Sequence, residues 1–200
     1  MRSKTMRKFI AFIQNVATGK TVLVFFVPAM VLYSVMLLYT IPQVGKYSPG
    51  MKLFDLSPSG YSFVYALELL HALGAKGRDL YLYQQLPLDF IYPGLFAVSC
   101  CLLLSWLFAK SLNANSKMFY LCFVPLVAGL FDYLENILIV RMLTSYPNVA
   151  ELHVSIASIL TILKSGFTTA FFLLLLVGII LFLKRKWTDN SNIKAQCNNG

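Results

Sequence analysis

Four long runs of apolar residues limit what this chain can fold into. They extend over residues 21–41, 88–109, 118–143 and 156–183. A helix of about 20 residues crosses the roughly 30 Å hydrocarbon core of a bilayer, because each residue adds about 1.5 Å. Each run reaches that length. We therefore predict an all-α integral membrane protein in which four transmembrane helices form a bundle.

The composition favours lipid over nucleic acid as the surroundings of this chain. Hydrophobic residues make up 58% of the 200 residues, and only 12% are charged, about half the share usual in a globular domain. The net charge is +9, but the basic residues stand at the ends of the apolar runs and form no patch with aromatic residues among them. Anionic headgroups attract cations placed in this way. The expected partner is a lipid bilayer, and nucleic acid is excluded.

The basic residues also predict the orientation of the helices. Lysine and arginine are enriched in the short cytoplasmic connections of membrane proteins. Residues 1–20, 110–117 and 184–200 all carry basic residues, whereas the connection 144–152 has none. We therefore predict that both termini are cytoplasmic, with the protein in a plasma membrane or a bacterial inner membrane.

The two ends of the chain differ in pattern. Residues 1–20 combine basic residues with apolar residues at helical spacing, which is typical of a helix lying in the membrane interface. Residues 184–200 are basic and polar. We expect them to form a disordered cytoplasmic tail.

The connection 42–87 is too long to be a simple loop, because loops beyond about 15 residues usually have structure or function of their own. Its first half is rich in proline and glycine. The stretch 61–73 then alternates apolar and polar residues at helical spacing. We predict an extracytoplasmic amphipathic helix there, between the first and second spans.

Local signals set the ends of that outer helix. Ser59 or Ser62 is placed to cap its first turn. Gly74 and Gly77 follow its last apolar residues, and glycine commonly ends a helix. Residues 78–86 are predicted to form a further helix that leads into the second span.

Charged residues inside the spans are the main functional signal. Such groups cost roughly 2.5 to 3.5 kcal/mol each on insertion scales, so they normally face the interior of a bundle and find partners there. They are Asp89, Asp132, Glu135, Arg141 and Lys164. Asn136 joins this set, because Asp132, Glu135 and Asn136 fall three and four residues apart and share one helix face.

Helix geometry predicts a contact between the third and fourth spans. Glu135 lies about 12 Å below an outer end at Leu143, and Lys164 lies about 12 Å below an outer end at Ile156. The two side chains therefore come to matching depth. Two acids against one lysine leave a surplus of negative charge, and Arg78 and Arg141 are the nearest further cations.

These residues predict an intramembrane polar pocket that opens outward. Its members are Asp89, Asp132, Glu135, Asn136 and Lys164. Possible contributors near the outer interface are Arg78, Arg141, His71 and His153. No spacing typical of metal ligands connects the histidines to one another or to the acids, so no metal and no cofactor is expected.

Several functions fit such a pocket. It can bind a small ligand, a lipid headgroup or a partner helix, from another membrane protein or a second copy of the chain. An alternative is an intramembrane enzyme for a lipid-like substrate, with Asp132 or Glu135 as acid or base and Lys164 stabilising negative charge. Another is a small transporter with Glu135 as proton carrier, and a purely structural role of the Glu135–Lys164 pair is equally open. We favour binding, which needs only the pocket.

Overall fold

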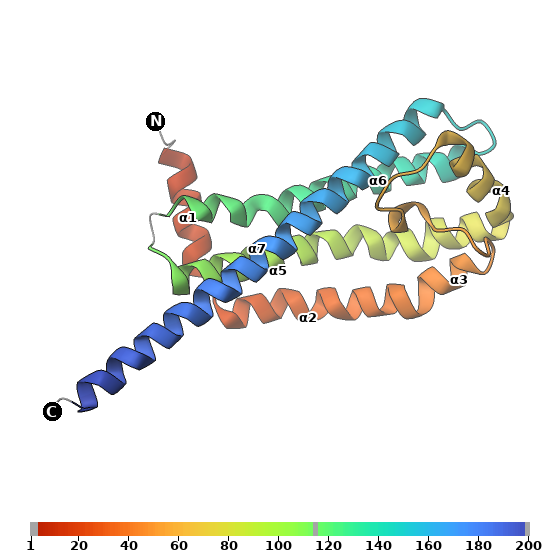
Figure 1. Cartoon of the computed structure of the whole chain (residues 1–200). Coiled ribbons are helices and arrows are strands. Elements are labelled where there is room, and N and C mark those ends of the chain that lie inside the picture. The colour runs from red at the N-terminus through yellow and green to blue at the C-terminus, as the bar shows by residue number, and fades with distance from the viewer. Residues whose placement is uncertain (1–3, 114–115, 199–200) are drawn as a thin grey trace.

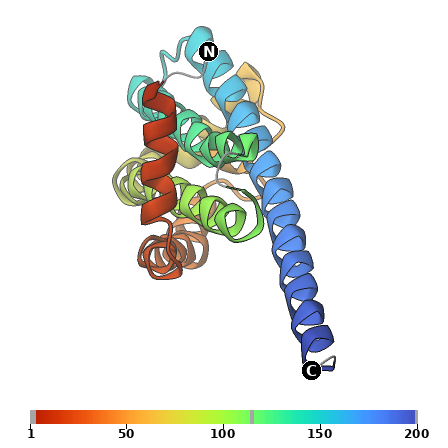
Figure 2. The same ribbon diagram turned by 90° about the vertical axis from the view of Figure 1, so that its left-hand side faces the viewer.

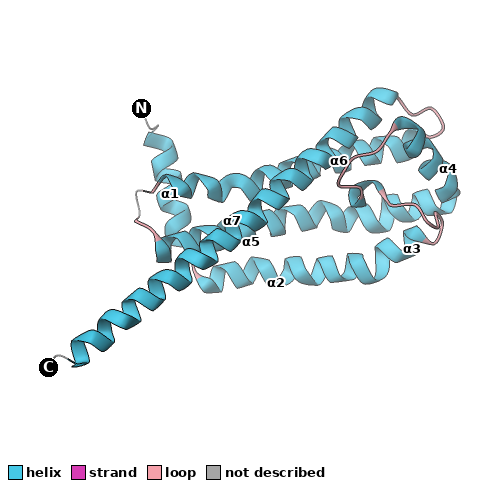
Figure 3. Ribbon diagram, in the orientation of Figure 1, coloured by secondary structure: helices cyan, strands magenta, loops and turns pink. Residues whose placement is uncertain are grey.

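The computed structural model describes residues 4–113 and 116–198, which form helices with no strand among them (Figure 3). Four helical runs in this part are long and apolar enough to cross a membrane: Gly19–Gly45, Phe63–Ser111, Lys117–Ser145 and Glu151–Thr188. The expectation of an all-α chain with four helices of spanning length is confirmed for these residues. The first three residues of the predicted basic arm and the last two of the predicted tail lie outside the described residues.

The helices follow one another with short connections (Figure 1). In chain order the α-helices are α1 (Lys4–Val16), α2 (Gly19–Val35), α3 (Ile41–Gly45), α4 (Phe63–Leu80), α5 (Leu86–Ser111), α6 (Val124–Ser145) and α7 (Glu151–Asn198). Between them lie the π-helical turns η1 (Met36–Thr40) and η3 (Tyr81–Gln85) and the 3-10 turns η2 (Phe54–Leu56) and η4 (Lys117–Phe123).

Helix α5 is the centre of the arrangement. It packs against α2 on one side and against α6 and α7 on the other, and α6 and α7 pack along each other. Figure 2 looks from the end that carries both termini and shows α1 crossing in front of the other helices. α1 also packs against α5, so a short helix lies across this end of the long helices.

The connection between α3 and α4 is more ordered than its composition suggests. Ser62 caps α4, because its side chain accepts a hydrogen bond from the Tyr65 backbone N–H at 3.1 Å. Gly74 interrupts α4 with φ 59° and ψ −174°, a conformation that residues with a side chain rarely adopt. Of the two predicted caps Ser62 is the one used, and Gly74 breaks the helix as expected.

Gly77 does not end the helix, contrary to the prediction. It is buried within the second part of α4, which continues through η3 into α5. A Cβ atom at Gly77 would lie 2.8 Å from Cβ of Tyr47. The close packing of Tyr47, which follows α3, therefore explains why this position is glycine.

The C-terminal residues also differ from the prediction. The structure continues α7 as one helix to Asn198, where we expected a disordered tail from Lys184. No glycine or proline occurs between residues 179 and 199 to stop the helix. Figure 1 shows this end of α7 projecting beyond the other helices.

The buried core falls into two apolar clusters. One holds Leu86, Ile139 and Ala157, near the end formed by α3, α4 and the 146–150 connection. The other holds Cys100 and Phe171, toward the end with both termini. Along α5, α6 and α7, the charged residues Asp89, Asp132, Glu135 and Lys164 come between the members of the two clusters. The fold thus places a polar layer between two apolar ones.

Candidate functional site

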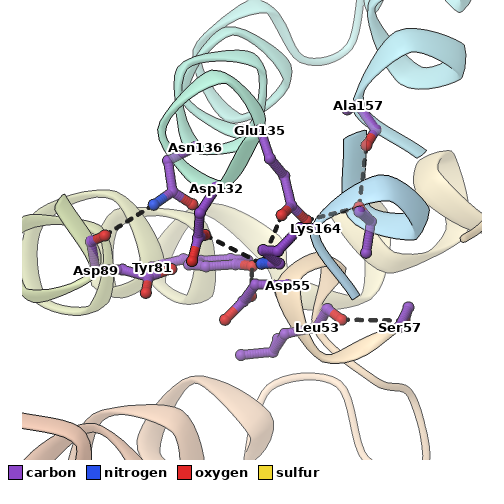
Figure 4. Close-up of polar contacts among 11 residues, drawn as sticks. Leu53, Asp55, Ser57, Tyr81, Asp89, Asp132, Glu135, Asn136, Ala157 and Lys164 are labelled. Carbon is purple, nitrogen blue, oxygen red and sulfur yellow. Dashed lines mark hydrogen bonds and ion pairs between the residues drawn. The ribbon is translucent and has the colours of Figure 1, made fainter. Parts of the chain in front are cut away.

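The acids of α6 point toward α5 and α7, as their spacing predicts. Glu135 and Asn136 are fully buried, and the Asp132 side chain is 14% exposed. Because they lie three and four residues apart, one helix face carries all three. Figure 4 shows them on the side of α6 that faces α5 and α7.

Lys164 of α7 joins both acids. Its Nζ lies 2.6 Å from Oε2 of Glu135 and 3.1 Å from Oδ1 of Asp132 (Figure 4). The predicted contact between Glu135 and Lys164 is therefore present. The depth estimate needs one correction, because α7 begins at Glu151 and α6 ends at Ser145, so both residues lie deeper below their helix ends than predicted.

Thr161 completes the surroundings of Glu135 and was missed from the sequence. Its Oγ1 donates a hydrogen bond to Oε1 of Glu135 at 2.6 Å and lies 3.0 Å from the carbonyl oxygen of Ala157. Thr161 is fully buried. Its position three residues before Lys164 places it on the same face of α7, and that spacing was the available signal.

Asp89 brings α5 into the site. Only 4% of Asp89 is exposed, and its backbone carbonyl accepts a hydrogen bond from Nδ2 of Asn136 at 2.9 Å. Its side-chain Oδ2 has no hydrogen-bond partner. A buried carboxyl oxygen without a partner is costly, so this group calls for an explanation.

A further acid comes from the connection between α3 and α4. Tyr81 is fully buried and donates a hydrogen bond to Oδ1 of Asp55 in η2 (Figure 4). The ring of Phe54 stacks on that of Tyr81, with centroids 6.3 Å apart. Neither residue of this hydrogen bond was predicted at the site, because Asp55 lies in the irregular half of the connection.

A cavity of about 570 Å³ connects these groups to an apolar wall. Its charged lining residues are Asp55, Asp89, Asp132 and Lys164. The large apolar and aromatic ones include Phe26, Met30, Tyr33, Tyr92, Phe96 and Phe172. These six side chains come from α2, α5 and α7, and Asp55 comes from η2.

First-span residues were not expected at the site. The predicted pocket residues all lie in the second, third and fourth spans, because the first span carries no charge. In the structure α2 supplies Phe26, Met30 and Tyr33 to the cavity. Tyr33 stacks on Tyr92 of α5, with ring centroids 5.5 Å apart, and this contact holds α2 against the site.

The four possible contributors do not reach the cavity. Arg78 donates to the carbonyl oxygen of Leu70 at 2.9 Å, and its guanidinium lies 4.3 Å from the ring centre of Tyr146. The helix break at Gly74 exposes such carbonyls, which explains this position of Arg78. Arg141 is exposed on α6.

The two histidines lie at the connection end of the molecule. His71 is exposed, and its Nδ1 lies 3.1 Å from the Tyr146 hydroxyl. His153 lies in the first turn of α7 and does not line the cavity. Among the described residues, no group of three His, Cys, Asp or Glu side chains is arranged to hold a metal ion.

Known proteins offer no guide to this site. The chain was compared with protein-family models, with curated proteins and with solved structures, and none of them matches it. The contacts, burial and charges around the cavity are therefore the basis for assigning a function.

Proposed function

We propose that this chain is a multi-pass integral membrane protein with a four-helix transmembrane bundle. The exposed surfaces of its long helices support this placement. Many large apolar side chains on these helices are exposed. Examples are Val24 of α2, Leu38 of η1 and Leu173 of α7, at 66%, 78% and 61% exposed. Leaving such surface in water is unfavourable by roughly 25 cal/mol per Å², and a bilayer removes that cost.

We propose that the protein lies in a plasma membrane or a bacterial inner membrane. Both termini are then on the cytoplasmic side. The basic α1, the C-terminal end of α5 and the basic stretch of α7 all lie at one end in Figure 1. The connection before α4 and the 146–150 connection lie at the other. This grouping agrees with the positive-inside rule.

Within that bundle, we propose that the cavity binds a small amphipathic molecule from the membrane. The observation that carries the proposal is the 570 Å³ cavity, which is lined both by charged residues and by an aromatic and aliphatic wall. Ligand sites are typically concave, mostly apolar and supplied with a few polar groups that orient the ligand. A headgroup would lie near Asp89 and Lys164 and a hydrocarbon chain along Phe96.

Binding is favoured over acid–base catalysis by the contacts of the α6 acids. Asp132 and Glu135 are both engaged by Lys164, and Glu135 is held by Thr161 as well. A catalytic acid or base must instead be free to exchange a proton with its substrate. These contacts suit a rigid wall for a ligand better than a reacting group.

Photolabelling tests this proposal. The protein would be reconstituted in phosphatidylglycerol nanodiscs with dodecanol that carries a diazirine at the chain end, and labelled residues mapped by mass spectrometry. We expect label at Met30 and Phe96. Ser165→Trp, which places a large side chain at the cavity wall, should remove it. Ser155→Trp, at an exposed position of the same helix, should not.

The contrary result is equally clear. Label confined to lipid-facing positions, or label at Met30 and Phe96 that survives Ser165→Trp as well as Ser155→Trp, would contradict the pocket. Thermal unfolding of both variants serves as the control for folding.

A further inference from the structure

Resting on the proposed function, we infer that the ligand of the cavity is a cationic amphiphile with an ammonium headgroup. Charge carries the argument. Four carboxyl groups, those of Asp55, Asp89, Asp132 and Glu135, surround Lys164. Lys164 is the one basic side chain among the described residues that line the cavity. A bound cation would reduce this imbalance.

The positive charge of Lys164 is already paired with neighbouring acids. Its Nζ contacts Asp132 and Glu135 at 3.1 and 2.6 Å, so one positive charge faces two acids before any other group is considered. An anionic headgroup would have to compete with these two carboxylates for the ammonium group. It would also meet Asp55 and Asp89 in the same cavity, and like charges in a poorly solvated site repel strongly.

Asp89 is the acid that most needs a partner. Only 4% of Asp89 is exposed, it lines the cavity, and its Oδ2 has no hydrogen-bond partner. The bond between Asn136 and Asp89 uses the backbone carbonyl of Asp89 and leaves Oδ2 of its carboxyl without a partner. An ammonium group donating to this carboxyl would supply both the charge and the hydrogen bond.

Aromatic rings line the same cavity as that carboxyl. Tyr92 follows Asp89 by three residues on α5, so both occupy one face of the helix. The ring of Tyr92 stacks between Tyr33 and Phe96, with centroid distances of 5.5 and 5.4 Å, and all three rings line the cavity. Aromatic faces attract ammonium and quaternary ammonium groups. The site thus combines the two features that recognise such cations.

Matched photoprobes test the inference. Dodecylammonium and dodecanoate, each with the same terminal diazirine as the dodecanol probe, would be compared in phosphatidylglycerol nanodiscs, which contain no competing ammonium lipid. Labelling at Met30 and Phe96 is divided by labelling at the exposed Leu176 and Leu183 of α7. This ratio removes differences in how the probes enter the bilayer.

We expect the ammonium probe to exceed dodecanol by at least about tenfold in this ratio, because a hydrogen bond to a charged partner is typically worth that much. Asp89→Asn should remove the preference, and thermal unfolding of the variant shows that it remains folded. The matched control Asp79→Asn changes an exposed carboxyl of α4 and should keep the preference.

The outcomes separate the two proposals. Equal labelling by the three probes, or a preference for dodecanoate, overturns the cationic ligand while the pocket stands. A preference for the ammonium probe that persists in Asp89→Asn overturns the role of Asp89. Absence of pocket labelling by all three probes overturns the proposed function itself.

Discussion

Nζ of Lys164 lies 2.6 Å from Oε2 of Glu135, and the same nitrogen lies 3.1 Å from Oδ1 of Asp132. The lysine therefore belongs to a triad of charges and not to a simple pair. A single lysine that joins two acids of α6 to α7 connects the two helices that pack most extensively in the fold. Changes to the three residues should consequently be coupled.

The triad predicts unequal effects of its single variants. Lys164→Met should lower the free energy of unfolding by about 3 kcal/mol, because it leaves two buried acids without their cation. Glu135→Gln should lower the free energy of unfolding by only about 1 kcal/mol, since Lys164 keeps its ion pair with Asp132. The double variant should be more stable than Lys164→Met alone. Unfolding by dodecyl sulfate in mixed micelles measures all three.

Additive losses in that double variant would contradict the coupling, because independent sites add and contacting ones do not. Lys186→Met is the control. Lys186 is exposed on the same helix, so its replacement should change the unfolding free energy little.

Thr161 should stabilise the site through its hydroxyl group. Thr161→Val keeps the shape of the side chain but removes the donor to the buried Glu135. We expect a loss of about 1.5 kcal/mol, the lower range for a hydrogen bond to a charged group. The same unfolding assay applies. Thr169→Val is the matched control, since the Thr169 hydroxyl donates to the Ser165 carbonyl of its own helix, and an equal loss there would refute a specific role.

Gly74 should tolerate a side chain poorly, because its backbone has a positive φ. No atom lies within 4 Å of a Cβ built there, but φ is +59°, so Gly74→Ala should cost about 1 to 2 kcal/mol in conformational strain alone. Gly45→Ala provides the comparison, with the same free space and no positive φ. It should be neutral or slightly stabilising. Similar unfolding free energies for the two variants would count against the helix break.

The proposed orientation can be tested by cysteine labelling. In a chain whose native cysteines are replaced by serine, Asn148→Cys and Asn113→Cys would place single thiols at exposed connections at opposite ends. A membrane-impermeant maleimide should label Asn148→Cys in intact cells. It should label Asn113→Cys only after permeabilisation, and the reverse pattern would invert the topology.

Periodicity was enough to predict the centre of the site. Asp132, Glu135 and Asn136 share a helix face by spacing alone, and the length of the apolar runs brought Lys164 to their level. Ser62 followed from the chemistry of helix capping. Such features depend on residues close together in the chain, or on helix length, and both can be read from a sequence.

Features that depend on tertiary packing were not predictable in the same way. Asp55 reaches the cavity because Phe54 is buried and Tyr81 binds its carboxyl, which no local pattern encodes. Arg78 turns away toward Leu70 because Gly74 breaks the helix. The first span has no charged residue to mark it, yet Tyr33 of α2 lines the cavity and stacks on Tyr92.

Native mass spectrometry of protein extracted gently from its own membrane tests the central claim most directly. We predict that the wild type and Ser155→Trp retain a small amphipathic molecule of defined mass, and that Ser165→Trp does not. An empty wild-type protein would contradict the claim. So would a molecule retained equally by all three proteins, while a second polypeptide in place of a small molecule would show that the cavity serves a partner subunit.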